Sequence, residues 1–118
     1  MNVMRKLAAA LGLALLMANG AVAETVAPRD AVENVGFTVT VEGVVSQVSI
    51  SRKGTVYINF GGWYPNHVFQ GVIFNDDARN FSNVRDLEGQ TVTIRGRIKM
   101  YNGKPEIIVD SPSQIQVR

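Results

Sequence analysis

The segment from Val92 to Lys99 constrains the fold more than any other part of this sequence. Apolar residues or glycine occupy every second position, and threonine, arginine or lysine fill the positions between them. An extended chain points successive side chains to opposite sides, so this period of two predicts a β-strand with one buried face. The predicted buried face carries Val92, Ile94, Gly96 and Ile98, and the predicted outer face carries Thr93, Arg95, Arg97 and Lys99.

The absence of cysteine limits the kind of sheet that such a strand can join. The chain contains no cysteine, so no disulfide can supplement its core. The fold must therefore rest on the burial of apolar side chains, which favours a closed barrel or a sandwich over a loop-rich scaffold.

A long first strand is predicted after Gly36. Its apolar residues change from one parity to the other, and a bulge near Gly43 would reconcile the two halves. One bent strand that serves both halves of a closed sheet is typical of small barrels. The apolar residues are Phe37, Val39 and Val41 on one face, and Val44, Val48 and Ile50 on the other.

The remaining patterns predict the other elements of a small barrel. Residues 28–35, followed by a glycine, indicate a short helix before the first strand. After the first strand we predict a turn at Arg52–Gly54, strands at Thr55–Phe60 and Val68–Phe74, a helix over residues 78–87, the strand at Val92–Lys99, a hairpin turn at Asn102–Gly103 and a strand at Glu106–Val109. Three strands, a helix and two strands is the order of the OB (oligonucleotide/oligosaccharide-binding) fold, so we expect an all-β domain with one short helix in a five-stranded Greek-key barrel.

The first 23 residues have the three parts of a secretory signal peptide. Arg5 and Lys6 give a positive start, an apolar stretch too short to span a bilayer follows, and small residues end at Ala23. We therefore expect cleavage after Ala23, no stable membrane insertion afterwards, and a periplasmic or secreted protein; an uncleaved membrane anchor is the alternative. The predicted organisation is a signal peptide at 1–23, a lead-in with the short helix at 24–36, and the barrel domain at 37–118.

The predicted mature domain has no net charge. The chain has 12 Lys and Arg residues and 10 Asp and Glu residues. Arg5 and Lys6 belong to the predicted signal peptide, whereas every acidic residue follows it. The field of the whole domain would therefore not attract nucleic acid, and binding would depend on local segregation of charge.

Three stretches of sequence resemble a known family. They are similar to the OB-fold domains of exported bacterial proteins, including those found beside secreted DNA nucleases, and more distantly to the anticodon-binding type of OB domain. The resemblance implies an accessory binding module without the chemistry of its neighbours. Some relatives carry a cysteine where this chain has Glu42, so no redox role carries over. The stretches are "DAVENVGFTVTVEGVV" at 30–45, "YINFGGWYPN" at 57–66 with "HVFQGVIF" behind it, and "GKPEIIVDSPSQIQV" at 103–117.

The OB order predicts where a ligand would bind. OB barrels bind across strands 2 and 3, between the loop joining strands 1 and 2 and the loop joining strands 4 and 5. Tyr57 is expected to expose its ring on this face, although packing against cross-strand neighbours is the alternative. The predicted ligand-binding residues are Arg52, Lys53, Tyr57 and Asn59, with Tyr101, Asn102 and Lys104 from the second loop; Arg52 and Lys53 have the alternative of ordinary solvated turn residues.

Two further groups are candidates for ligand contact. Trp63 and Tyr64 could form a stacking surface or a lid, and packing over the barrel mouth is the alternative that the resemblance favours. Arg95 and Arg97 belong to the one stretch of segregated positive charge, which also includes Lys99 and Lys104. This stretch could track phosphates, or it could simply solvate the strand and protect a sheet edge.

The sequence predicts a binding module and no enzyme. His67 is the only histidine, and it has no cysteine or paired carboxylates nearby in the sequence with which to complete a zinc site or a nucleophile–base pair, so we expect an ordinary loop residue. Asp76 and Asp77 are expected to cap the helix. We expect no catalytic residue, metal or cofactor, and a monomer. The expected partner is single-stranded nucleic acid; the alternative is an envelope protein, or a small cationic or glycan ligand, bound through the same face.

Overall fold

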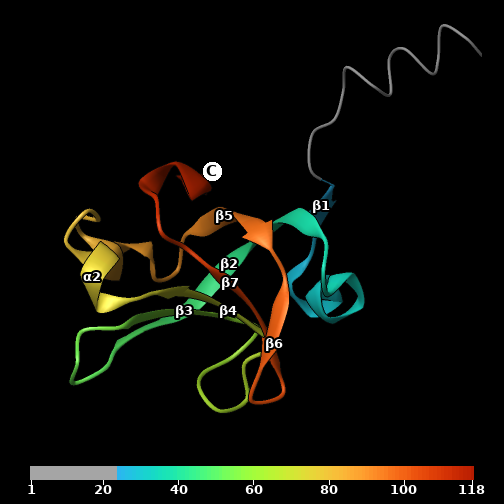
Figure 1. Ribbon diagram of the computed structural model, residues 1–118, viewed down its shortest axis with the longest axis horizontal. Helices are drawn as coiled ribbons and strands as arrows, with labels where there is room; N and C mark the ends of the chain where they lie inside the picture. Colours follow the sequence, from blue (N-terminus) through green and yellow to red (C-terminus); the bar gives the residue numbers. More distant parts are fainter. Residues whose placement is uncertain (1–23) are drawn as a thin grey trace, which may run out of the picture.

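The structure is a coiled β-sheet with short helices, and its longest strand is the one predicted after Gly36. A computed structural model describes residues 24–118, so the predicted signal peptide lies outside the described residues. Figure 1 shows the elements: β1 (Thr25–Val26), the 3-10 helix η1 (Pro28–Asn34), β2 (Thr38–Ile50), β3 (Val56–Phe60), β4 (Phe69–Ile73), α2 (Asn75–Ala78), η2 (Val84–Leu87), β5 (Thr91–Arg97), β6 (Lys99–Tyr101), β7 (Lys104–Ile108), η3 (Pro112–Gln114) and β8 (Ile115–Val117).

Strand β2 joins both halves of the sheet, as predicted for the first strand. Its first half pairs antiparallel with β5, and its second half pairs antiparallel with β3. The register shift lies between Val45 and Gln47, not near Gly43. The prediction placed the bulge too early because Val44 was counted with the inward residues of the second half. Val44 is 56% exposed, and Val45 beside it is buried.

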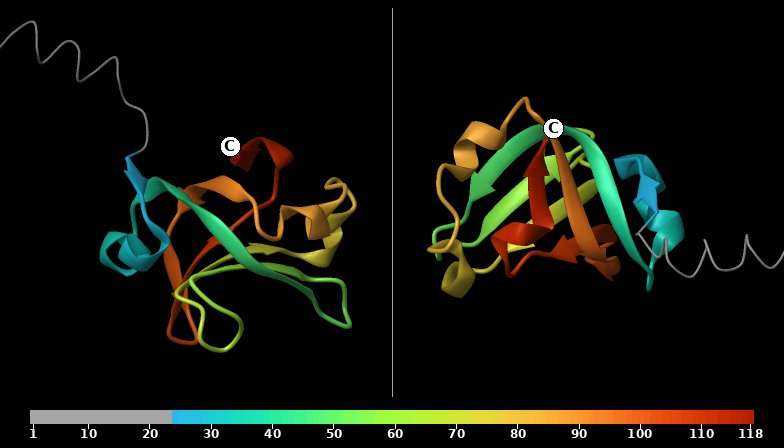
Figure 2. Two further views of the ribbon diagram at one scale, coloured as in Figure 1. Left: turned by 180° about the vertical axis from the view of Figure 1, so that it is seen from behind. Right: turned by 90° about the horizontal axis from the view of Figure 1, so that it is seen from above.

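The sheet contains more strands than predicted and remains open. Its eight strands follow the order β6-β7-β4-β3-β2-β5-β8, with β1 added parallel to β2. The five predicted strands correspond to β2, β3, β4, β5 and β7, and β1, β6 and β8 are short additions. The sheet coils around the core (Figure 2), yet no ladder joins β7 to β5 among residues 24–118. The prediction of a closed five-stranded barrel was therefore wrong in strand number and closure, although the mainly β architecture is consistent with an OB fold.

The core lies inside the coiled sheet and follows the predicted alternation. Val56, Ile58 and Phe60 of β3 are buried, as are Val92 and Ile94 of β5. Every residue of β4 is buried, which explains why its dense apolar sequence gave no face assignment. The first residue of the predicted first strand behaves differently, because Phe37 lies before β2 and is 65% exposed.

The predicted helix over residues 78–87 is replaced by two short turns. Helix α2 ends at Ala78, and η2 begins at Val84 after a left-handed Asn83. The apolar residues of this segment still pack against the core: Ala78, Phe81, Val84 and Leu87. Asp76 and Asp77 lie within the first turn of α2, whose N-cap is Phe74 with no side-chain hydrogen bond, so the predicted capping role was wrong.

Candidate functional site

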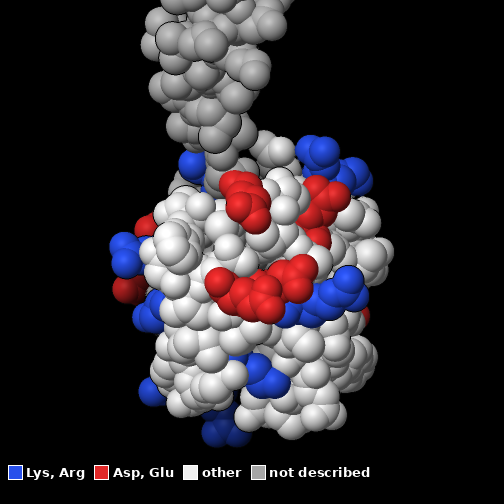
Figure 3. Space-filling view, turned by 90° about the vertical axis from the view of Figure 1, so that its right-hand side faces the viewer, with Lys and Arg blue, Asp and Glu red and all other residues white. Residues whose placement is uncertain are grey.

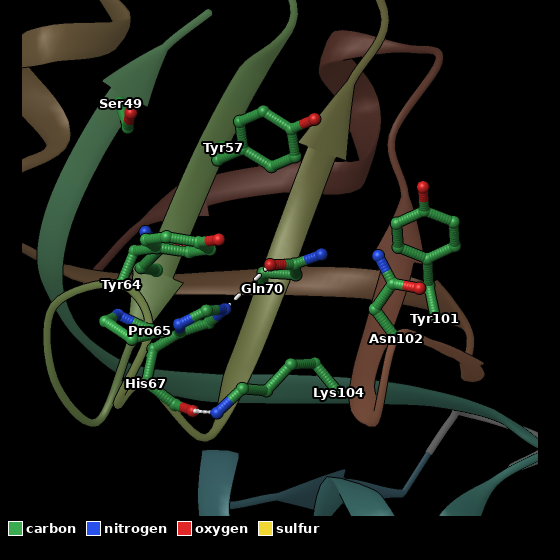
Figure 4. A pocket seen from close by; sticks show the side chains of 10 residues that line it. Ser49, Tyr57, Tyr64, Pro65, His67, Gln70, Tyr101, Asn102 and Lys104 are labelled. Carbon is green, nitrogen blue, oxygen red and sulfur yellow. Dashed lines mark hydrogen bonds between the residues drawn. The ribbon is translucent and has the colours of Figure 1, made fainter.

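A hollow of about 480 Å³ opens on the outer face of β3 and β4, the face that the OB order predicts for ligands. Figure 4 shows Gln70 at its centre, Tyr64 and His67 on one side, and Tyr101 and Asn102 on the other. Three tyrosine rings therefore surround a polar floor. The lining residues are Ser49, Tyr57, Asn59, Tyr64, Pro65, His67, Gln70, Tyr101, Asn102 and Lys104.

The loop between β3 and β4 builds one wall of the hollow. Gly61 and Gly62 have φ values of 78° and 141°, which let the chain turn back sharply over β3. Two side chains of β2 then hold the loop: the Gly62 N–H donates to Ser46 Oγ at 3.1 Å, and the Tyr64 N–H donates to Gln47 Oε1 at 3.0 Å. The loop is thereby fixed against the outer face of the sheet.

This loop explains why Asn59 is buried. Asn59 points to the outer side of β3, as predicted, but only 1% of it is exposed. Its Nδ2 donates to Gln47 Oε1 at 2.9 Å. The alternation of the strand gave the correct side of the sheet, and it carried no information about the loop that covers that side.

A chain of buried polar side chains runs along the floor. His67 Nε2 lies 2.7 Å from Gln70 Oε1, and Gln70 Nε2 donates to Glu106 Oε1 at 2.8 Å. All three side chains are at most 6% exposed. The prediction that His67 is an ordinary loop residue was therefore wrong. Buried polar groups linked in this way hold one another in fixed orientations.

The β6–β7 hairpin builds the opposite wall. Asn102 and Gly103 both have positive φ, as a tight hairpin turn requires. The turn lies beside the β3–β4 loop in Figures 1 and 2, and Lys104 Nζ donates to the His67 carbonyl oxygen. The hairpin and the loop thus meet through this hydrogen bond, and Tyr101 faces the hollow from the hairpin side.

The structure brings together about half of the predicted ligand-binding residues. Tyr57, Asn59, Tyr64, Tyr101 and Lys104 line one hollow, and so does Asn102. Tyr57 is partly buried at the strand end nearest the β2–β3 turn. That turn holds the exposed Arg52 and Lys53, which lie beyond the lining residues.

The other predicted residues lie elsewhere. Trp63 and Tyr64 are 64% and 73% exposed, so packing over a barrel mouth does not describe them. Trp63 is absent from the lining of the hollow. Arg95 and Arg97 are exposed on β5, and Arg95 lines a smaller groove of about 200 Å³ beside the Arg118–Glu42 ion pair.

Sequence reasoning missed the floor of the hollow. His67, Gln70 and Glu106 contribute its buried polar chain, and Ser49 and Pro65 complete the lining. One signal was available. Gln70 interrupts the apolar run of β4, and Glu106 precedes the apolar run of β7. A polar residue in a strand buried on both faces needs a partner there, and that need points to a second buried polar group.

Comparison with known proteins assigns the domain. The model of the tRNA anticodon family, described as an OB-fold nucleic acid binding domain, matches residues 39–115. The chain belongs to this OB-fold family. No curated protein sequence matches the chain.

Two solved structures share the fold of this OB domain. A protein assigned as an aspartyl-tRNA synthetase from Leishmania major Friedlin has a TM-score of 0.56 at 12% identity, with 80% of this chain and 20% of that chain covered. The S. pombe Stn1-Ten1 complex has a TM-score of 0.50 at 17% identity, with 69% of this chain and 57% of that chain covered. The OB domain therefore corresponds to only part of each structure, and these likenesses concern its fold alone.

The charge of the OB domain is mixed on the side shown in Figure 3. Acidic side chains gather near the centre of this face, and most basic ones lie around its margin. Within residues 24–118, no group of three His, Asp or Glu side chains is arranged to hold a metal ion. No helix in the described part of the chain has the length and apolar character needed to cross a membrane.

Proposed function

We propose that this OB-fold domain binds single-stranded nucleic acid across the hollow on β3 and β4. The observation that carries the proposal is the ring of Tyr57, Tyr64 and Tyr101 around that hollow. Bases stack on aromatic faces whatever their sequence, and each stacked base contributes about 1–3 kcal/mol. The family supports the same ligand class, because its model describes a nucleic acid binding domain.

Positively charged side chains at both ends of the hollow support the proposal that a single nucleic-acid strand crosses it. Arg52 and Lys53 lie in the turn beyond Tyr57, and Lys104 lines the other end. Three phosphate contacts would give a slope of about −2 when log K is plotted against log salt concentration. We therefore expect modest affinity with weak salt dependence.

We further propose that the domain acts as an exported, non-catalytic and monomeric binding module. The only histidine is held in a buried chain with Gln70 and Glu106, and no hydroxyl group in the described part of the chain is hydrogen-bonded to its ring. The first 23 residues support export, and N-terminal sequencing of the protein from a periplasmic extract tests cleavage after Ala23. Sedimentation tests the oligomeric state, and turnover of nucleic acid by the pure protein would contradict the non-catalytic role.

Fluorescence titration of labelled single-stranded DNA and RNA at several salt concentrations tests the binding function. We expect salt-sensitive binding that Tyr101→Ala weakens. Thr40→Ala, which changes the smaller groove on the β5 side, serves as the matched control and should bind normally. No binding at micromolar protein would refute the proposal. Nuclease-insensitive capture of one envelope protein would instead favour the protein-binding alternative.

A further inference from the structure

Two hydrogen-bond acceptors in the lining of the hollow have no protein partner. The atoms are Asn59 Oδ1 and His67 Nδ1, the two buried side-chain atoms without a hydrogen bond among residues 24–118. Both side chains are 1% exposed, and both line the hollow. A buried polar atom without a partner is costly and calls for an explanation, and a bound ligand that supplies the missing donor is one such explanation.

A carboxylate at the end of the buried chain fixes the first acceptor. The Glu106 carboxylate accepts a hydrogen bond, so Gln70 turns its NH₂ group toward it and its carbonyl oxygen toward His67. The His67 Nε2 facing that oxygen must then carry the proton. A neutral imidazole has one N–H, so Nδ1 is left as an acceptor.

A backbone N–H fixes the second acceptor independently. The Tyr64 N–H donates to Gln47, so the Gln47 oxygen occupies that position. The same oxygen also receives the Asn59 NH₂ group. Asn59 therefore uses its NH₂ group toward Gln47, and its carbonyl oxygen remains as an acceptor.

We propose that the hollow selects a nucleobase that carries an exocyclic amino group, a proposal that rests on the nucleic-acid-binding function above. Adenine, cytosine and guanine each present such a donor. Thymine and uracil have no exocyclic amino group. Their ring N3–H donor lies between two carbonyl oxygens, and an N3–H that approaches Asn59 Oδ1 or His67 Nδ1 brings those oxygens against the acceptors of the hollow. Tyr57 and Tyr101 supply the stacking that holds any base, whereas the two acceptors discriminate between bases.

Tyr64 packs on one of the two side chains that carry these acceptors. Its ring stacks on His67 with the ring centroids 5.9 Å apart and the planes 30° from parallel. The ring is also among the most exposed apolar groups of the domain. The Nδ1 lone pair lies in the plane of the His67 ring, so an amino group must approach it at the ring edge. Because both acceptor atoms are buried in the free protein, a neighbouring side chain must move aside first, and the exposed Tyr64 ring is the one that we expect to move. Base selection is thus coupled to displacement of the Tyr64 side chain.

Four oligonucleotides test the selectivity. Each is an oligothymidine with one central position occupied by thymine, cytosine, adenine or guanine, and binding to the wild-type protein is measured by titration. We expect an amino-bearing base to tighten binding about tenfold, the value of one well-placed pair of hydrogen bonds. Equal binding of all four would overturn this inference and leave the binding function intact. Failure of all four to bind would refute the function itself, and capture of a neutral glycan in its place would point to hydroxyl donors.

The orientation of His67 tests the mechanism without any ligand. Since His67 is the only histidine in the chain, its ring nitrogens can be assigned directly by ¹⁵N NMR at mildly alkaline pH. We expect a proton on Nε2 and none on Nδ1; the opposite tautomer would overturn the inference.

Glu106→Gln tests whether the base preference depends on the hydrogen-bond chain that orients His67. A neutral amide can donate as well as accept, so Gln70 is free to flip and His67 Nδ1 is no longer held as an acceptor. The base preference should therefore fall to the part that Asn59 Oδ1 carries, while the protein remains folded by circular dichroism. Glu42→Gln makes the same chemical change in the groove on the β5 side and should keep the preference. An unchanged preference in folded Glu106→Gln protein would overturn the proposed control by Glu106.

Discussion

The two outer faces of the sheet carry similar polar side chains but differ in the volume of their hollows. The β3–β4 face has a hollow of about 480 Å³ between two loops, whereas the face near β5 and β8 has a groove of about 200 Å³. The β5 face displays the exposed Arg95 and Arg97, yet its charges remain in solvent. The comparison teaches that a row of charges on a strand does not by itself make a site.

The loops create the difference. On the β3–β4 face, the β3–β4 loop and the β6–β7 hairpin form the walls of the hollow and meet through Lys104 and the His67 carbonyl. On the β5 face, the ion pair of Glu42 and Arg118 spans 3.9 Å between side chains that are 39% and 57% exposed. Water screens such a pair strongly, so the pair contributes little to holding the side chains of this face in place.

The largest expected effect comes from truncating a side chain in the core that both faces share. Ile94 is fully buried, and its Cδ1 lies only 2.7 Å from where a side chain on Gly71 would begin. Ile94→Ala should lower the free energy of unfolding by about 2–5 kcal/mol, measured by chemical denaturation. Val44→Ala, at an exposed position, should change it by less than about 0.5 kcal/mol. Equal losses in the two variants would mean that the inside and outside of the sheet are wrongly assigned.

A smaller effect is expected on binding, and it tests which of the two faces binds the ligand. Tyr57→Ala should weaken binding of single-stranded nucleic acid by about 1–3 kcal/mol because one stacking ring is lost. Titration with labelled oligonucleotide measures the change, and thermal melting checks that the domain stays folded. Thr93→Ser on the β5 side should bind normally. If Thr93→Ser lost binding and Tyr57→Ala did not, the ligand would bind on the β5 face, which contradicts the proposed site.

A charge change tests the ends of the hollow. The double variant Arg52→Ala and Lys53→Ala should flatten the slope of log K against log salt by about 1.4, since each phosphate contact contributes about 0.7. Titrations over a range of salt concentrations measure it. The matched double variant Arg95→Ala and Arg97→Ala should keep the slope. If the Arg95 and Arg97 variant flattens the slope instead, the nucleic acid binds along β5, and the β5 face is the binding face.

The smallest effect concerns the exposed ion pair. Glu42→Gln should change the free energy of unfolding by less than about 0.5 kcal/mol, because solvent screens its interaction with Arg118. Denaturation of the wild type and the variant side by side measures the difference. A loss above about 1 kcal/mol would show that the Glu42–Arg118 pair on the β5 face stabilises the domain more than its exposure indicates.

Prediction from the sequence worked where short-range rules apply. The alternation in Thr55–Phe60 and Val92–Ile98 gave the buried face correctly because adjacent side chains of a strand point to opposite sides. The Asn102–Gly103 turn was also correct, since positive φ is a local property. The helix over residues 78–87 was wrong because an apolar spacing of three suits separate turns packed on a core equally well.

The site was predicted only in its aromatic and cationic parts. Tyr57, Tyr101 and Lys104 could be nominated because the order of the strands fixes the face and its flanking loops. His67 could not be nominated, because its role depends on Gln70 and on Glu106, which lies 36 residues beyond Gln70. Contacts over that separation arise from the parallel pairing of β4 with β7, which no local pattern encodes.

The sequence by itself determined that this chain forms a mainly β domain, which side chains of its clearest strands face inward, and where two of its tight turns lie. These properties follow from the geometry of neighbouring residues. Only the tertiary structure of residues 24–118 decided that the sheet stays open within them, that Asn59 and His67 are buried, and that two acceptors in the hollow lack a partner among these residues. Those properties depend on loops and strands distant in sequence, whose positions are set by packing over the whole molecule.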